Sequence, residues 1–319
     1  MNQKYLNFVE KNYSQLTGFD YFFSDIKKSI EFCKNNNIEI FDFEIINNKD
    51  LLACISLFYD KNNETAIFGF FECIDDEIIF KEIWEKLFIK AKQLGIKKLI
   101  GPINANTWFQ YRCISFTDNE NFFPSEPLSK KYYSLFFSKI SGIKVIDYHS
   151  AYRKNFDTII KITESSYNLA INQNFRIETV ETPNFEQIKQ IYQLSKIIFS
   201  QNWGYQEISF ENFLNLYNKE KIDKYVASIY LLLSENTIIG FASNLMFSNT
   251  LIMKTIGILP EYQSQGLGNA LVHKIHLDAV NKGVEKIIYA LVKKTNKVKY
   301  FPTDDIQVFR EYSAFELEI

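Results

Sequence analysis

Residues 256–273 combine side chains that suit the binding of an anionic phosphate. An apolar stretch ends at Pro260, a polar turn follows, and an amphipathic helix is predicted from about Gly266. Such a turn can aim several main-chain N–H groups and the positive end of the helix dipole at one point. Gly266 and Gly268 leave room for a phosphate against the main chain, and Gln263 can add a neutral donor. The pattern therefore predicts a pyrophosphate-binding turn.

The elements that must position this turn follow a regular order. Around it, the second half of the chain predicts three strands, a helix and a strand, at residues 226–234, 238–247, 251–259, 266–282 and 286–292. The first half predicts the same order, at residues 38–46, 51–59, 65–74, 75–93 and 97–100. A strand at 175–180 and helices at 185–199 and 210–221 are also expected in the second half. Two similarly built halves are therefore predicted, without an obvious residue-level repeat.

A polar stretch at residues 163–174 precedes the strand predicted at 175–180. It is the simplest place for a domain boundary. A length of 319 residues also fits two domains at about 150 residues each. The sequence therefore predicts domains at 1–172 and 173–319.

Composition and charge exclude several classes of protein. Hydrophobic residues make up 46% and charged residues 23%, which is typical of a globular chain. The formal charge of -2 gives no overall reason to expect a nucleic-acid or membrane partner. The chain shows no apolar run of transmembrane length and no signal-peptide pattern at its start, so a cytoplasmic protein is expected. The spacing of the four cysteines predicts reduced thiols and no metal site.

The turn resembles a known signature. Gln263-x-x-Gly266-x-Gly268, with Ile258 and Pro260 before it, is similar to the acyl-CoA signature (Q/R-x-x-G-x-G/A) of the GNAT superfamily of N-acetyltransferases. Other stretches resemble a bacterial subgroup of this superfamily with two domains in tandem: residues 69–76, 101–108, 111–112, 202–205 and 310–315. The resemblance implies an α/β fold of two GNAT-like domains in tandem, each a twisted mixed sheet flanked by helices.

The resemblance also implies an activity and a cofactor. An acyl group, most simply acetyl from acetyl-CoA or else that of another acyl-CoA, would pass to an amine of a small molecule or peptide, without a metal. The acyl-CoA would contact main chain and side chains at Ile256, Ile258, Gln263, Ser264, Gln265, Gly266, Leu267, Gly268, Asn269 and Asn296.

The catalytic residues are less clear, because the chain departs from the family pattern at two places. Residues 251–259 contain no Asp or Glu, so Glu261 or Glu207 is the candidate base, unless water or no dedicated residue serves. Thr303 stands where the family has a tyrosine after the position of Asn296. Tyr300 is therefore the candidate acid, with Tyr312 as a substitute.

The first half carries Asp75, Asp76 and Glu77 where the second half has its glycine-containing turn. Carboxylates at a helix start satisfy its N–H groups and repel another anion. We therefore expect a degenerate first domain without a CoA site, which supports the second domain or shapes its acceptor pocket.

Several other groups of residues could have either a structural or a functional role. His273 and His276 are expected on the surface of a helix rather than in a metal pair. A run of lysines could attract the 3'-phosphate of CoA or be a solvated basic run: Lys293, Lys294, Lys297 and Lys299. Two loops could contact an acceptor or pack between domains: Asn104, Asn106, Trp108, Tyr111 and Arg112, and Asn202, Trp203, Gly204 and Tyr205.

Two other functions remain open at this point. The absence of Asp and Glu from residues 251–259, and of the family tyrosine at position 303, is consistent with a noncatalytic acyl-CoA-binding or interaction protein. Peptidoglycan-bridge enzymes, which also pair two such folds, suggest an aminoacyl transferase that uses aminoacyl-tRNA. The intact turn and the absence of a basic charge balance disfavour the latter.

Overall fold

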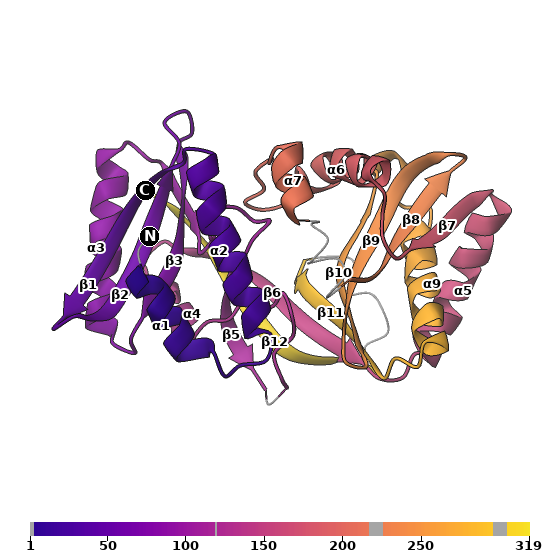
Figure 1. Ribbon diagram of the computed structural model, residues 1–319, viewed down its shortest axis with the longest axis horizontal. Coiled ribbons are helices and arrows are strands. Elements are labelled where there is room, and N and C mark those ends of the chain that lie inside the picture. The colour runs from indigo at the N-terminus through magenta and orange to yellow at the C-terminus, as the bar shows by residue number, and fades with distance from the viewer. Residues whose placement is uncertain (1–2, 119, 217–225, 296–304) are drawn as a thin grey trace. The chain divides into compact units, whose positions relative to one another are not determined.

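The computed structural model describes residues 3–118, 120–216, 226–295 and 305–319 (Figure 1). The chain forms two compact units. Unit 1 contains Met1–His149 and Phe309–Ile319, and unit 2 contains Ser150–Val308.

This division differs from the predicted boundary at residue 172. Residues 163–172 belong to helix α5 (Asp157–Asn172), which packs on helix α9 (Leu267–Asn281) inside unit 2. The helix buries only Ile159, Thr163 and Ala170, so its sequence is polar enough to be mistaken for a linker. The last residues of the chain return to unit 1 as part of a strand, which no local pattern indicates.

Unit 1 contains a mixed sheet and four helices among its described residues. The helices are α1 (Gln3–Tyr13), α2 (Phe19–Asn35), α3 (Glu77–Gln93) and α4 (Tyr132–Ser138). The strands are β1 (Glu39–Asn47), β2 (Asp50–Tyr59), β3 (Thr65–Cys73), β4 (Lys98–Gly101), β5 (Cys113–Thr117), and most of β6 (Lys144–Arg153) and β12 (Gln307–Glu318). Strands β1, β2 and β3 are antiparallel neighbours, β3 and β4 are parallel, and β12 is antiparallel to β4 and β5.

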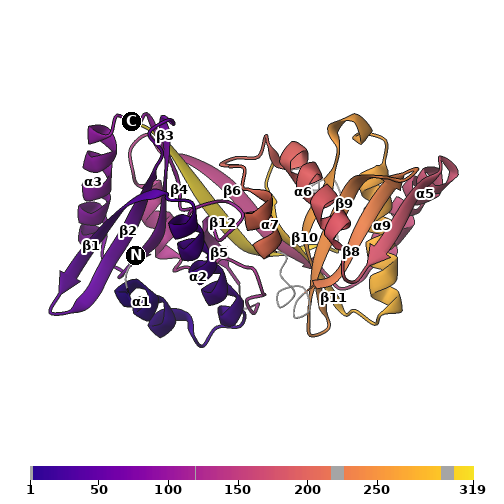
Figure 2. The same ribbon diagram turned by 45° about the horizontal axis from the view of Figure 1, so that its top comes forward.

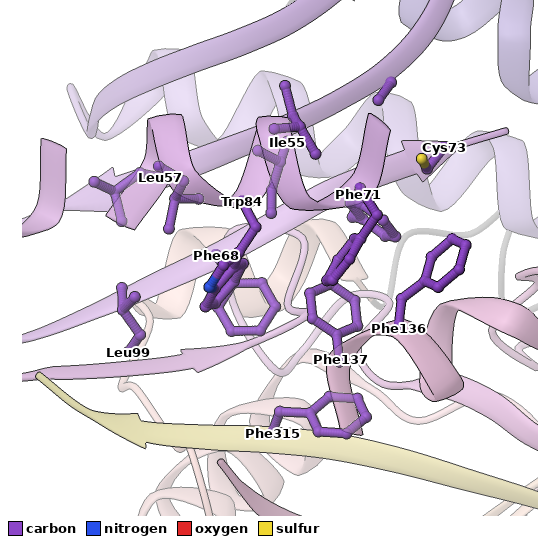
Figure 3. Close-up of a cluster of buried hydrophobic side chains, with 14 of the residues drawn as sticks. Ile55, Leu57, Phe68, Phe71, Cys73, Trp84, Leu99, Phe136, Phe137 and Phe315 are labelled. Atoms are coloured by element: carbon purple, nitrogen blue, oxygen red, sulfur yellow. The ribbon is translucent and has the colours of Figure 1, made fainter. Parts of the chain in front are cut away.

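Helices cover both faces of the β1–β4 sheet. On one face, Phe70 contacts Tyr5 of α1 with ring centroids 5.6 Å apart. On the other, Phe68 packs edge-on against Trp84 of α3 at 5.2 Å and lies beside Phe137 of α4 (Figure 3). Aromatic side chains therefore form much of this core, which explains part of the high aromatic content.

Unit 2 shares with unit 1 a stretch of three strands, a helix and a strand. After α5 come β7 (Phe175–Val180), α6 (Phe185–Phe199), α7 (Phe210–Leu216), β8 (Val226–Ser234), β9 (Thr237–Phe247), β10 (Thr250–Ile258), the short 3-10 helix η1 (Pro260–Tyr262), α9 and β11 (Lys286–Lys293). Within the unit the strand order is β11-β10-β9-β8-β7. Among the described residues of these five strands, only the β10–β11 pair is parallel. The predicted order of three strands, a helix and a strand is thus confirmed in both units.

The helices of unit 2 also lie on two faces of its sheet (Figures 1 and 2). Ile258 of β10 is in the core that includes Leu271 of α9, on the face covered by α5 and α9. The neighbouring residue Gly257 faces α6 instead, because a Cβ atom there would lie 2.8 Å from the Ile198 side chain. Helix α6 begins at a capping box, in which Asn184 and Gln187 exchange two 2.9 Å hydrogen bonds.

The mixed α/β fold class predicted from the sequence is confirmed. All four cysteines are buried free thiols, as their spacing predicted. Within the described ranges, we find no helix with the length and apolar character needed to span a membrane.

Candidate functional site

The turn before α9 has the unusual backbone expected of an anion-binding loop. Ser264 and Gly266 adopt left-handed conformations, with φ of 63° and 79°. Short segments of this kind curl so that successive N–H groups point to one side. Helix α9 then begins at Leu267.

The turn leaves a run of main-chain donors unused. Among the described residues, the N–H groups of 264–269 have no hydrogen-bond acceptor. The first N–H with a helical partner is that of Ala270, which donates to the Gly266 carbonyl at 3.0 Å. Unpaired N–H groups at a helix N-terminus favour a bound anion. Residues 263–269 include no carboxylate that could compete.

The two glycines of the turn have different reasons to be there. At Gly266 the positive φ favours glycine, and a Cβ atom there would lie 3.3 Å from Ser166 Oγ. At Gly268 a Cβ atom would meet only Ile258 Cδ1, at an ordinary 3.8 Å. Space within the protein does not demand glycine at 268.

The Gln263 side chain holds the turn in place. Its side-chain amide donates a 2.9 Å hydrogen bond to the Ile258 carbonyl, and so closes the turn onto the end of β10. The Gln265 amide similarly donates to the Glu261 carbonyl at 3.2 Å. The Gln263 amide therefore braces the loop, and its contact with acyl-CoA stays a prediction.

Strands β10 and β11 part next to the turn. Their pairing ends at Met253 and Tyr289, although both strands continue for several residues. The Leu259 N–H bonds to Ile239 of β9. Because main-chain groups alternate in direction along a strand, those of Ile256 and Ile258 point away from β9, toward the gap. A bulge between Met253 and Thr255 lies where the gap begins.

Within the described part of the chain, the candidate catalytic residues do not form one cluster. Glu261 lies exposed in η1, and its side chain has no partner in the described part of the chain. Glu207 forms an ion pair with Lys196. Tyr300 and Asn296, and likewise Lys297 and Lys299, lie outside the described residues. Tyr312 belongs to unit 1, where its buried hydroxyl donates to Glu126 at 2.5 Å.

The two helix histidines are buried, which corrects the expectation that they lie on the surface. His273 is 5% exposed and His276 is fully buried. Nε2 of His276 lies 2.7 Å from the Tyr289 hydroxyl, and burial lowers the pKa of His276 to about 4. Within the described ranges, no three His, Cys, Asp or Glu residues are grouped as metal ligands.

The corresponding helix start in unit 1 is built from carboxylates. Asp76 caps α3 by accepting from the N–H groups of Ile78 at 2.8 Å and Ile79 at 3.2 Å. Glu77 pairs with Lys81 and Lys139, whose hydrogen bonds lower the pKa of Glu77 to about 2. The donors that are unused in unit 2 are thus occupied here by a side chain.

The loops with polar and aromatic residues are mostly ordered by their own contacts. Asn104 accepts from the Phe70 N–H at 2.8 Å, and Asn106 accepts from the Trp108 N–H at 3.1 Å. Arg112 is buried and lies over the Tyr111 ring. In unit 2, residues 202–205 form a turn closed by the Tyr205 N–H and the Asn202 carbonyl.

Sequence reasoning missed two buried polar residues. Glu72 on β3 is 3% exposed, and burial raises its pKa to about 7. Asn244 on β9 is fully buried, and neither end of its amide has a hydrogen-bond partner among the described residues. Glu72 is the single charged residue of an apolar strand, and Asn244 follows Ser243 in another largely apolar strand; polar residues within such runs are the signal that could have found them.

Comparisons with known proteins agree with this geometry. Residues 186–299 match the model of the acetyltransferase (GNAT) family. A search of curated proteins finds no match to the sequence.

Three solved structures with a similar fold illustrate the relationship. One is a fungal multi-domain β-N-acetylglucosaminidase with a GCN5-related glucosamine N-acetyltransferase region (TM-score 0.56, 10% identity, 91% of this chain and 34% of that chain). The chain thus spans about a third of that protein's length. The second is a GCN5-related N-acetyltransferase from Anabaena variabilis (TM-score 0.55, 9% identity, 98% of this chain and 69% of that chain). The third is a tandem GNAT protein from the clavulanic acid biosynthesis pathway (TM-score 0.52, 9% identity, 88% of this chain and 83% of that chain).

At these identities the structural likeness concerns the fold, whereas the family model matches the sequence around the turn directly. The chain therefore has the fold of tandem GNAT proteins, and its residues 186–299 match the model of the GNAT acetyltransferase family.

Proposed function

We propose that unit 2 transfers an acyl group, acetyl in the simplest case, from acyl-CoA to an amine of a small molecule or peptide. The observation that carries the proposal is the run of unpaired N–H groups at 264–269, next to the gap between β10 and β11. A family match alone would leave open whether this chain keeps a usable cofactor site.

The residues present fit acyl-CoA. The N–H groups of 264–269 would hold the pyrophosphate, and no neighbouring carboxylate in the turn opposes its charge. The main-chain groups of Ile256 and the Ile258 N–H would pair with the pantetheine amides in the gap. The Ile258 carbonyl is already taken by Gln263. When bound, acyl-CoA supplies an activated thioester carbonyl.

The chain's own groups then stabilise charge and move protons. An N–H group near the bulge of β10 would stabilise the negative charge that develops on the carbonyl oxygen. Glu261, whose side chain is exposed, would accept a proton from the acceptor ammonium, directly or through water. Tyr300 would supply a proton to the departing thiolate.

Unit 1 is proposed to lack a CoA site. Asp76 occupies the first N–H groups of α3, and Glu77 adds a second negative charge at the same helix start. A pyrophosphate there would lose its donors and meet like charges.

A noncatalytic acyl-CoA-binding protein is the second candidate, favoured by the absence of any carboxylate on β10 (Thr250–Ile258). Thiol release from acetyl-CoA, measured over a panel of primary amines, separates the two. Amine-dependent release supports the transferase. Tight CoA binding without release for any amine supports the binding protein.

A further inference from the structure

A β-bulge in β3 directs the Glu72 side chain. The register between β2 and β3 shifts by one residue between Cys54 and Ser56. Within this bulge Phe70 has a φ of 44°, and its N–H donates to Asn104 Oδ1 at 2.8 Å. Bulges of this kind re-aim side chains and are common beside binding sites.

The loop after β4 lies directly on this bulge. A Cβ atom on Gly69 would come within 1.9 Å of the Ile103 carbonyl oxygen, so only glycine allows the approach. The same loop carries Arg112, whose guanidinium lies between two rings, 3.8 Å from the centroid of Tyr111 and 4.0 Å from that of Tyr148.

Only one of the two oxygens of the Glu72 carboxyl group accepts hydrogen bonds from described residues. The hydroxyls of Tyr13 and Tyr133 both donate to the same oxygen, Oε2, at 3.0 and 2.7 Å. Oε1 has no hydrogen-bond partner among the described residues. An acceptor with no partner inside a protein is costly unless a ligand or water completes it.

A cavity of about 40 Å³ adjoins this carboxyl group. Besides Glu72 it is lined by Tyr5, Phe22, Phe71, Pro102, Asn104, Gln110, Tyr111, Arg112, Cys113, Pro127, Leu128, Ser129 and Tyr133. Such a volume holds about three water molecules, or a ligand with a similar number of heavy atoms. All of these residues belong to unit 1.

We propose that this cavity is a second ligand site, which binds a small molecule carrying a primary ammonium group hydrogen-bonded to Glu72 Oε1. The carboxylate supplies both the acceptor and the opposite charge. Side chains such as Gln110 and Ser129 can accept the remaining N–H bonds. Because Arg112 also lines the cavity, the rest of the ligand is neutral or anionic rather than a second cation. The proposal does not rest on acyl transfer, since binding needs no CoA.

Calorimetric titration of the full chain at pH 8 in phosphate buffer tests the site. The probes are methylammonium, ethanolammonium and glycine, with acetate as an anionic control. We expect one site per chain for at least one ammonium compound, with a Kd on the order of 1 mM for so few heavy atoms, and no acetate binding. Binding of acetate alone, or of none of the four, overturns the proposal.

Two variants tie the binding to the carboxylate. Glu72→Gln should weaken binding at least about tenfold, whereas Glu85→Gln, an exposed change on α3, should leave it unchanged. Equal affinity of Glu72→Gln and the wild type contradicts the assignment.

Should Glu72→Gln fail to fold, wild-type crystals soaked in ethanolammonium give the answer independently. Density that places the ligand nitrogen within hydrogen-bond distance of Oε1 supports the site. Water alone in the cavity at a saturating concentration overturns it.

Discussion

The side-chain amide of Gln263 donates a 2.9 Å hydrogen bond to the main-chain carbonyl of Ile258, five residues earlier. This bond joins the end of β10 to the turn before α9. It gives the side-chain donor at position 263 a structural role in the turn. The turn is thereby held in the conformation in which its N–H groups remain unpaired.

Replacing Gln263 should therefore weaken CoA binding through loss of this brace. Gln263→Ala loses the brace, and one hydrogen bond of about 1 kcal/mol corresponds to roughly fivefold weaker binding. Gln263→Arg keeps a donor of similar reach and should bind nearly as well as the wild type. Calorimetric titration with CoA measures both, and equal weakening in the two variants would argue against the brace.

Gly268 offers a test of charge at the proposed cradle. Because a side chain at 268 meets only Ile258 Cδ1 at 3.8 Å, substitution should leave the fold intact. Gly268→Asp adds a negative charge beside the pyrophosphate, where about 4 kcal/mol of repulsion at roughly 4 Å corresponds to roughly 1,000-fold weaker CoA binding. Gly268→Asn has the same shape without the charge and should lose much less. Similar affinities for Asp and Asn would show that no anion is bound there.

Glu72 should make the stability of the protein depend on pH. Burial raises its pKa from 4.5 to about 7, so the folded state binds the proton more tightly than the unfolded state. This contribution is complete below pH 4.5 and is lost as the pH rises through 7, for a total of about 3 kcal/mol.

Urea unfolding of the wild type and Glu72→Gln in phosphate buffer measures this contribution. The stability of the variant relative to the wild type should increase between pH 5 and pH 8. Glu85→Gln should show a constant difference over the same range. A constant difference for Glu72→Gln as well would mean that the buried carboxyl does not titrate as proposed.

His276 should act in the opposite direction, at lower pH. Burial lowers its pKa from 6.5 to about 4, so the folded state favours the neutral ring. Its contribution is complete above pH 6.5 and is lost as the pH falls through 4, again about 3 kcal/mol in total. The free energy of unfolding of His276→Gln, relative to the wild type, should rise as the pH falls from 7 to 4.5. An unchanged difference would refute the assignment.

The sequence predicted unit 2 well because its elements carry their own signals. The helix at 185–199 and the strands at 175–180 and 226–234 match α6, β7 and β8. Position 266 was predicted as both a turn residue and the helix start. In the structure Gly266 has a positive φ, and α9 begins at the next residue, Leu267. The spacing of apolar residues and the glycines at turns are local properties of the sequence. They therefore predict an element without knowledge of the elements that pack against it.

What the sequence could not predict depends on distant contacts. Arg310 and Glu126 are nearly 200 residues apart, yet their buried 2.7 Å ion pair joins the last strand to unit 1. The buried state of His273 and His276 follows from α5 packing on α9, which a polar-looking α5 sequence conceals. The role proposed for Glu72 likewise depends on Tyr13 and Tyr133, which both donate to one of its two oxygens.

A crystal structure of the full chain with acetyl-CoA tests the central claim most directly. It should contain one CoA per chain, with pyrophosphate oxygens accepting hydrogen bonds from the N–H groups of residues 264–269 and with the thioester between β10 and β11. A pyrophosphate bound elsewhere, a second CoA at the start of α3, or no CoA at saturating concentration would contradict it.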